Sequence, residues 1–181
     1  MNKIIKASEI YTTAHENPET PLRKLVYETL DKLKIPFERV DSDEVVTMED
    51  CAAVDKRLDV KMVKTLFLSN RQLTEFYLFV TCGDKPFRAK NFSAELEIPR
   101  VSFAPAELML EKLGVEIGAA TFFGVLLESA HDVRAIFDAD VLREEFIGCS
   151  DGVTTGYMKL RTTDVKRILA HAGKSPEIIH I

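Results

Sequence analysis

The chain has 181 residues, 46% of them hydrophobic, a length that suits one well-filled core better than two. Its 24 Lys and Arg against 29 Asp and Glu give a net charge of -5, which argues against broad electrostatic capture of a nucleic-acid backbone but leaves room for a small local footprint on a nucleic-acid end. The three cysteines are widely spaced and lack the paired spacing that holds zinc, so reduced thiols in a cytoplasmic protein are expected. No apolar run approaches the ~20 residues of a membrane span, so no membrane location is expected.

The hydrophobic pattern predicts a series of helices and strands. Thr20 followed by Pro21 forms a good helix N-cap with proline at the first helical position, and apolar residues then recur at helical spacing as far as Leu33. Residues 1–20 are expected to form an N-terminal extension, and residues 21–181 a single domain. The further expected elements are a strand over residues 36–40, a helix over 47–58 opened by a capping box, strands over 61–69 and 75–81, a helix over 89–96, a strand over 100–104, a helix over 105–114, strands over 125–127 and 133–137, a strand pair over 145–148 and 154–160, a helix from residue 163 and a closing strand over 178–181.

This order predicts an α/β (mixed α+β) fold in which one mixed, mostly antiparallel sheet is flanked by helices. Its centre is expected to be an antiparallel hairpin formed by residues 61–69 and 75–81. Lys64 lies near the start of the first arm, at the margin of the sheet. A lysine in that place can hold a phosphate or a substrate carboxylate as a compact cation. The alternative is that its stem lies along apolar surface with the ammonium in water.

Generic catalytic motifs are absent from the sequence, including Gly-rich phosphate loops, nucleophile elbows and metal-binding histidine pairs. The four histidines are expected to be solvated, and Cys149 and Ser150 have no histidine at a partnering position, which favours a turn over a nucleophile. Residues 118–124 place small residues between two glycines and predict a loop whose backbone approaches a ligand. The phenylalanines, Phe103 among them, are expected in the core. The residues by themselves therefore predict a loop-lined pocket and a basic anchor.

Five segments in this order resemble the YbaK/ProX family of prolyl-tRNA editing deacylases, over nearly the whole chain from Leu22 onward. The resemblance is closest to the free-standing ProX or PrdX branch, whose Lys-Asn-Leu-Phe-Leu strand and Leu-Ser-Phe-Ala element recur here in near-identical form. The five segments are Thr47-Met48-Glu49-Asp50, Val63-Lys64-Thr65-Leu66-Phe67-Leu68, Gly83-Asp84-Lys85, Val101-Ser102-Phe103-Ala104 and the loop from Gly118 to Gly124.

The resemblance implies hydrolysis of the ester that links a mischarged amino acid to the 3′ end of a tRNA, without metal, cofactor or covalent intermediate. Lys64 matches the family's lysine, which is thought to hold the phosphate of the terminal nucleotide, and Gly118 matches the glycine of a Gly-x-x-x-Pro loop that positions the ester and the attacking water. An aminoacyl ester is already activated, so orientation and oxyanion donors can supply much of the rate. Lys64, Lys85 and Arg88 are the candidate cations for the nucleic-acid end, and the partners to expect are the aminoacyl-tRNA 3′ end and a synthetase.

Three positions depart from the family pattern: Thr65 stands for asparagine, Phe122 for the loop proline, and Ser150 for histidine. In the family these positions shape the amino-acid pocket, so the amino acid is left open. Phe122 could select a smaller group, and Ser150 could hydrogen-bond a polar side chain. The full set of expected substrate-binding residues is Thr47, Thr65, Phe122, Gly124, Ser150 and Thr154.

Two functions of other classes remain open beside a trans-editing deacylase. One is a non-catalytic module that binds aminoacyl-tRNA ends or a synthetase. The other is a regulator that binds an amino-acid-like ligand in the same pocket. Loss of both turnover and end binding in a Lys64→Ala variant would favour the enzyme, whereas stabilisation by free amino acids without hydrolysis would favour the regulator.

Overall fold

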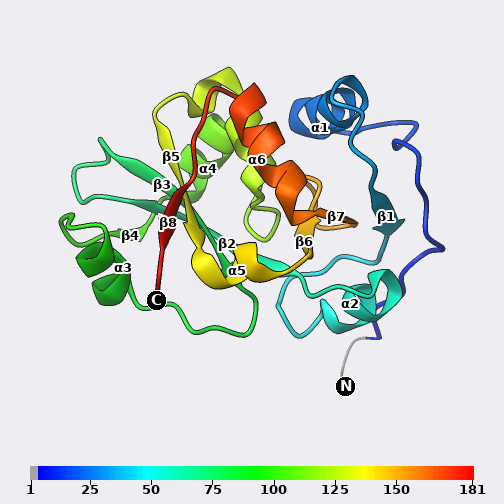
Figure 1. Ribbon diagram of the computed structural model, residues 1–181, viewed down its shortest axis with the longest axis horizontal. Coiled ribbons are helices and arrows are strands. Elements are labelled where there is room, and N and C mark those ends of the chain that lie inside the picture. The colour runs from blue at the N-terminus through cyan, green and yellow to red at the C-terminus, as the bar shows by residue number, and fades with distance from the viewer. Residues whose placement is uncertain (1–3) are drawn as a thin grey trace.

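The computed structural model describes residues 4–181 and divides their strands between two sheets, with helices packed around both (Figure 1). The strands are β1 (Glu38–Asp41), β2 (Val63–Ser69), β3 (Phe76–Cys82), β4 (Ser102–Phe103), β5 (Val133–Asp138), β6 (Phe146–Ser150), β7 (Gly156–Arg161) and β8 (Glu177–Ile179). The helices are α1 (Pro21–Lys32), α2 (Ala52–Leu58), α3 (Ala89–Glu95), α4 (Ala106–Leu113), α5 (Ala139–Arg143) and α6 (Thr162–His171), with 3₁₀ helices η1 (Phe122–Leu126) and η2 (Glu128–Ala130).

The larger sheet has the order β4-β2-β3-β5-β8 and contains the predicted hairpin. β2 and β3 pair antiparallel from Val63 opposite Cys82 to Ser69 opposite Phe76. β3 and β5 are parallel, and so are β5 and β8, which makes the sheet mixed. The closing strand therefore pairs within its own chain, beside β5. The mixed α/β fold expected from the sequence is confirmed.

The smaller sheet has the order β1-β7-β6 and is wholly antiparallel. A single parallel bridge between Met62 and Gly148 joins it to the start of β2. A Cβ atom on Gly148 would lie 2.7 Å from Met62 Cε and 3.0 Å from the carbonyl oxygen of Lys61, so this junction depends on the absence of a side chain. The expectation of one sheet was wrong in this respect, because contact at one residue pair does not continue into a ladder.

Residues 125–127 do not form the expected strand, because most of them belong to η1. The helix begins after Thr121, whose hydroxyl accepts a hydrogen bond from the amide of Phe123 at 3.5 Å. Phe122 and Phe123 are fully buried in the main core, which α1, α6 and the inner strands share. A short apolar run buried on all sides has no periodicity that separates a strand from a helical turn, so the pattern could not distinguish them.

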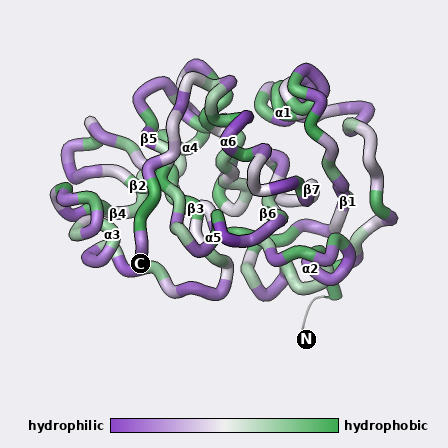
Figure 2. The backbone as a smooth tube through the Cα atoms, viewed as in Figure 1, coloured by the Kyte–Doolittle hydropathy of each residue, from purple (hydrophilic) through white to green (hydrophobic). Residues whose placement is uncertain are grey.

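The described part of the expected N-terminal extension lies along β1. Tyr11 and Arg39 exchange two main-chain hydrogen bonds of 2.8 Å, and Ala7 bridges to Ser42. Residues 1–3 of the extension lie outside the described residues. Figure 2 shows hydrophobic residues along the inner strands and hydrophilic ones at the outer loops. No helix within residues 4–181 is both long and apolar enough to cross a membrane.

Candidate functional site

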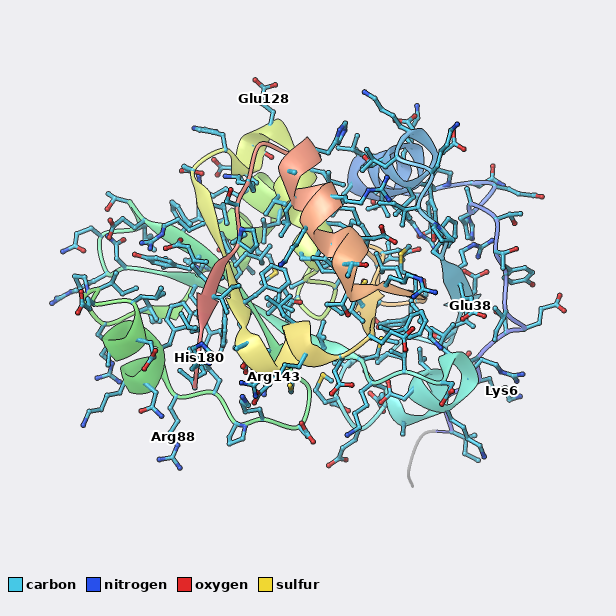
Figure 3. All side chains as sticks on the ribbon, viewed as in Figure 1. Lys6, Glu38, Arg88, Glu128, Arg143 and His180 are labelled. Carbon is cyan, nitrogen blue, oxygen red and sulfur yellow. The ribbon has the colours of Figure 1, made fainter. Side chains whose placement is uncertain are left out.

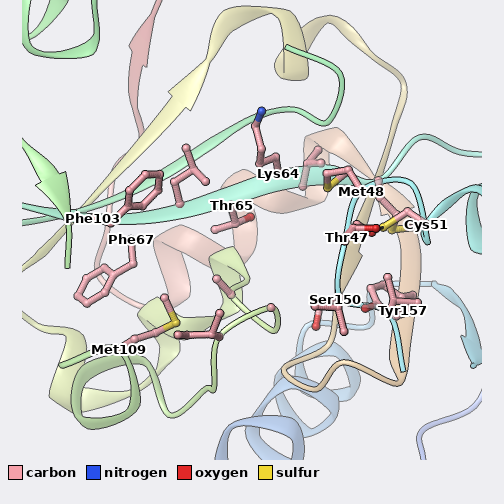
Figure 4. A pocket seen from close by; sticks show the side chains of 18 residues that line it. Thr47, Met48, Cys51, Lys64, Thr65, Phe67, Phe103, Met109, Ser150 and Tyr157 are labelled. Carbon is pink, nitrogen blue, oxygen red and sulfur yellow. Dashed lines mark hydrogen bonds between the residues drawn. The ribbon is translucent and has the colours of Figure 1, made fainter. Parts of the chain in front are cut away.

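A cavity of about 330 Å³ opens along an uncovered edge of β2 (Figure 4). β4 pairs with β2 only at Leu68 and Ser69, and the last contact on that side is a 3.0 Å bond from the amide of Ala104 to the carbonyl of Phe67. The six consecutive residues 62–67 all line the cavity. Because successive side chains of a strand point to opposite faces, such an unbroken run places the cavity at the strand's edge rather than on one face.

Residues from six other strands, helices and loops complete the wall. They come from the loop before α2, from β4 and α4, from the loop before η1, and from the facing ends of β6 and β7. The lining residues besides those of β2 and Met62 are Val45, Val46, Thr47, Met48, Cys51, Phe103, Met109, Ile117, Gly118, Ala120, Ser150 and Tyr157.

Lys64 is the one charged side chain among the described residues that line the cavity. Its Nζ donates a hydrogen bond to the main-chain carbonyl of Lys85, in the loop that follows β3. No other acceptor within residues 4–181 takes a hydrogen bond from it, although a lysine ammonium has three N–H groups. Figure 4 shows Lys64 and Thr65 on opposite sides of the strand. The site is thus an apolar and hydroxyl-lined cavity with a single cation at its edge.

The two other predicted cations do not line this cavity. The ammonium of Lys85 lies 2.7 Å from Asp138, 2.8 Å from Asp140 and 2.6 Å from the main-chain oxygen of Ile181. Burial opposes its charge, but the two carboxylates outweigh this and raise the pKa of Lys85. Arg88 is exposed and extends from the surface (Figure 3). The side chain of Lys85 is therefore engaged by carboxylates and by Ile181 and not free for a nucleic acid, while its main-chain carbonyl accepts from Lys64. Arg88 stays a predicted cation for the nucleic-acid end.

Four hydroxyl groups line the cavity. Thr47 accepts from the amide of Asp50 at 3.2 Å, and Asp50 accepts in return from the amide of Thr47 at 3.1 Å, which are the two bonds of the predicted capping box. They close a turn and do not open a helix: α2 begins only at Ala52, so the expected helix start at residue 47 was wrong. Ser150 donates to the carbonyl of Val153 and accepts from the amide of Gly152, both at 3.0 Å.

The two remaining cavity hydroxyls, those of Tyr157 and Thr65, differ in whether they already form a hydrogen bond within the protein. That of Tyr157 donates to the carbonyl of Thr154 at 3.2 Å, and burial raises its pKa well above the ordinary value. The Thr65 hydroxyl bonds to no other described residue within 4–181, so it is the one available to a ligand without breaking an existing contact.

Gly118 lies in the loop between α4 and η1, with its backbone facing the cavity. Its φ of +91° is a conformation that favours glycine. A Cβ atom placed there would lie 3.4 Å from the methyl group of Thr154, which is ordinary contact, so conformation rather than space requires the glycine. Thr154 adjoins the loop without itself lining the cavity.

Phe122 and Gly124, both expected at the pocket, lie in the core instead. Phe122 has 0% of its surface exposed, and its ring centre is 4.4 Å from that of Phe123. Gly124 lies under α4, where a Cβ atom would approach Leu113 to 3.0 Å. Because η1 turns this segment inward, only its start, at Gly118 and Ala120, reaches the cavity. The spacing between Gly118 and Phe122 in the sequence therefore did not predict correctly that Phe122 lies in the core.

Sequence reasoning missed several residues of the wall. Phe103 was expected in the core but is 64% exposed, and Ile117, just before Gly118, is 72% exposed. The signal for Phe103 was that its strand is short and followed at once by Pro105, which is typical of a sheet edge. Cys51 also lines the cavity, and burial, together with nearby Asp55, raises the pKa of its thiol to about 11.

Comparisons with known proteins show which family this chain resembles. A model of the aminoacyl-tRNA editing domain matches residues 42–168, which include every lining residue of the cavity. The prolyl-tRNA editing protein ProX of Acetoanaerobium sticklandii is 24% identical over 88% of this chain and 97% of its own length. Prolyl-tRNA synthetase associated domain-containing protein 1 of Danio rerio is 28% identical over 87% of this chain and 86% of its own.

A solved structure shares the fold. A crystal structure of a candidate trans-editing enzyme for prolyl-tRNA synthetase superposes with a TM-score of 0.63 at 16% identity, covering 90% of this chain and 98% of that one. At that identity the likeness concerns the fold alone. The family model covers well over half of the sequence: it begins just after β1 and ends within α6, so it includes β2 to β7. The chain belongs to the aminoacyl-tRNA editing domain family.

Proposed function

We propose that this protein is a trans-editing aminoacyl-tRNA deacylase, which hydrolyses the ester between a mischarged amino acid and the 3′ end of a tRNA. The observation that supports it best is the cavity itself: one cation, Lys64, stands at the edge of an uncharged, hydroxyl-lined hollow in a domain of the editing family. A phosphodiester beside Lys64 would compensate its charge, and the uncharged wall suits a small aminoacyl group. The names of the relatives favour a proline tRNA as the carrier.

In the reaction, water attacks the carbonyl carbon of the ester, the bond from that carbon to the ribose oxygen breaks, and the ribose oxygen takes up a proton. The lining includes no Asp, Glu or His within residues 4–181, so orientation has to supply much of the rate. Lys64 would fix the terminal nucleotide by its phosphate, and the backbone near Gly118 would come close to the ester. A hydroxyl of the terminal ribose would assist the proton transfer.

The hydroxyl of Thr65 is the group we assign to contact with the amino acid, because it bonds to no other described residue. Thr47 and Ser150 line the cavity nearby, with their hydroxyls already engaged by neighbouring main-chain groups. Such a wall suits alanine or a small hydroxylated or thiol side chain better than a large or charged one.

The test is hydrolysis of tRNAs charged with alanine, serine, threonine, cysteine and proline. Wild-type protein should hydrolyse one or two of these, and Lys64→Ala should lose both hydrolysis and binding of the charged end while keeping its thermal stability. Lys61→Ala is the matched control, since Lys61 is exposed, lies three residues away and does not line the cavity. Loss of hydrolysis in both variants would remove the special role of Lys64.

A non-catalytic module is the second candidate, and the absence of acid-base side chains from the described lining favours it. Such a module would bind the charged end, or a synthetase, without turnover across the whole panel. A synthetase partner and a cytoplasmic location are part of the proposal for the enzyme as well.

We further propose that residues 21–181 form the editing domain and residues 1–20 an extension of it. Deletion of that extension, which pairs with β1 through Tyr11, tests whether the domain folds alone.

A further inference from the structure

Phe103 is an exposed aromatic ring at the rim of the cavity. It lies in β4, lines the cavity and has 64% of its surface exposed, although most phenylalanines of the chain are buried. Ile117, which is 72% exposed, also lines the cavity, and exposed apolar side chains that gather at a cavity are typical of a binding site. We therefore expect the molecule that occupies the cavity to cover the ring of Phe103 with an apolar face.

The ring is supported from behind by a row of aromatic side chains. Phe79 packs against Phe92 at 4.9 Å between ring centres, and Phe92 against Phe87 at 5.9 Å. Phe87 then meets Phe103 at 5.9 Å with an interplanar angle of 62°, an edge-to-face contact. This row leads from the core to the surface and fixes Phe103 before any ligand arrives, which lowers the entropic cost of stacking on it.

Phe103 and Lys64 lie on the same side of β2. Phe103 is opposite Leu68 in the register, and cross-strand partners share a face. Lys64 is four residues from Leu68 and, by the period of two, is on that face as well, with about 13 Å between their Cα atoms. Figure 4 shows both side chains on the side of β2 away from Thr65. Leu66 lies between them on that face and also lines the cavity, so an apolar side chain separates the cation from the ring.

We propose that Phe103 is the stacking platform for the base of the 3′-terminal nucleotide, whose phosphate Lys64 holds. The inference rests on the proposed function and adds the position of the base. Stacking on an aromatic ring accepts any base and suits a single-stranded end, since a paired base has no free face. The nearby cation favours a nucleotide over an uncharged peptide or a second copy of the chain.

The test measures binding of the trinucleotide CCA, so that its result does not depend on hydrolysis. Phe103→Ala should bind CCA about 5- to 100-fold more weakly than wild type, as expected for loss of one base–aromatic stack, and Phe103→Trp should restore binding. The matched control is Leu110→Ala: Leu110 is also apolar and 57% exposed, but lies on α4 outside the cavity lining. It should bind CCA as wild type does.

A probe that ends in an abasic nucleotide distinguishes stacking from a general defect. Wild type should bind this probe as weakly as Phe103→Ala binds CCA, and the variant should lose nothing further. Equal binding of CCA by wild type and Phe103→Ala would overturn the inference. So would a change of oligomeric state in Phe103→Ala without a change in CCA binding, since the ring would then serve an interface between copies. If wild type binds CCA through Phe103 but hydrolyses no charged tRNA, the proposed function fails and the platform stands.

Discussion

The guanidinium of Arg23 donates from Nε to Oδ2 of Asp151 at 2.9 Å, with 2% and 1% of these side chains exposed. The hydroxyl of Tyr27 donates to the same oxygen. Burial opposes the charge on Arg23, but Asp151 outweighs it, so the pKa of Arg23 is raised. Asp151 directly follows Ser150, a residue of the cavity wall. The contact therefore fixes α1 to the loop that carries part of the site.

Arg23→Met should destabilise the protein strongly, because it leaves the carboxylate of Asp151 buried without its cation. We expect the free energy of unfolding in urea to fall by about 3–5 kcal/mol, the usual cost of breaking a buried pair. Arg143→Met is the control: Arg143 is 70% exposed and pairs with Asp140 at 2.7 Å, so its loss should cost less than about 1 kcal/mol. Similar losses in the two variants would mean that the buried pair contributes no more than a surface one.

Gly118→Ala should lower kcat for hydrolysis strongly while lowering the melting temperature only modestly. A left-handed backbone costs a residue with a Cβ atom about 1–2 kcal/mol, and relief of that strain would shift the loop that faces the cavity. Gly173→Ala is a matched control, because Gly173 has a φ of +71° with nothing within 4 Å of a Cβ atom and does not line the cavity. Both variants should melt at lower temperature, and only Gly118→Ala should lose kcat. Full activity in Gly118→Ala would remove the loop from the mechanism.

Local signals in the sequence predicted most of the fold. Thr20 and Pro21 begin α1 as expected, with the Thr20 hydroxyl accepting from the amide of Arg23 at 3.1 Å. The hairpin of β2 and β3 follows from two apolar runs separated by a polar turn. These features depend on residues close together in the chain, so sequence patterns contain them.

The site was less predictable because it depends on distant contacts. Arg23 and Asp151 are 128 positions apart, and neither has a local pattern that marks it as buried. Lys85 was expected beside a nucleic acid, but two aspartates of the β5–α5 junction surround its ammonium. Phe122 lies in the core, as expected of the phenylalanines, and not at the pocket where the family pattern put it, while Phe103 is exposed, since burial is set by how η1 and β4 pack and not by residue type. Tertiary packing decides such cases.

Thiol reagents should leave the protein active at neutral pH. The thiol of Cys51 lines the cavity, but burial and the carboxylate of Asp55 raise its pKa to about 11, so the reactive thiolate is scarce. Burial also raises the pKa of Cys82 and of Cys149. We expect iodoacetamide at pH 7.5 to alkylate the folded protein negligibly, as measured by mass spectrometry, and Cys51→Ser to keep its hydrolytic activity. Inactivation together with alkylation of Cys51 at neutral pH would point to a covalent route.

The ion pair between β5 and β8 should make stability depend on acid pH. Arg134 donates two hydrogen bonds to Glu177, at 2.8 and 2.6 Å, and these hold the pKa of Glu177 below its ordinary value. A folded-state pKa below the unfolded one means that the pair stabilises the protein above the unfolded pKa of about 4.3 and loses this effect as pH falls through the lower folded value.

The change that tests this pH dependence is Glu177→Gln, compared with wild type by urea denaturation from pH 7 to pH 3. Both side chains are about 40% exposed, so the difference at pH 7 should be under about 1 kcal/mol. It should shrink towards zero on the acid side. The single variants Glu177→Gln and Arg134→Gln and the double variant together form a double-mutant cycle. The coupling energy from this cycle excludes the separate contribution of the contact between Arg134 and the ring of Tyr77 at 5.1 Å. A coupling energy that stays constant down to pH 3 would show that the Glu177 carboxylate is not the group that titrates.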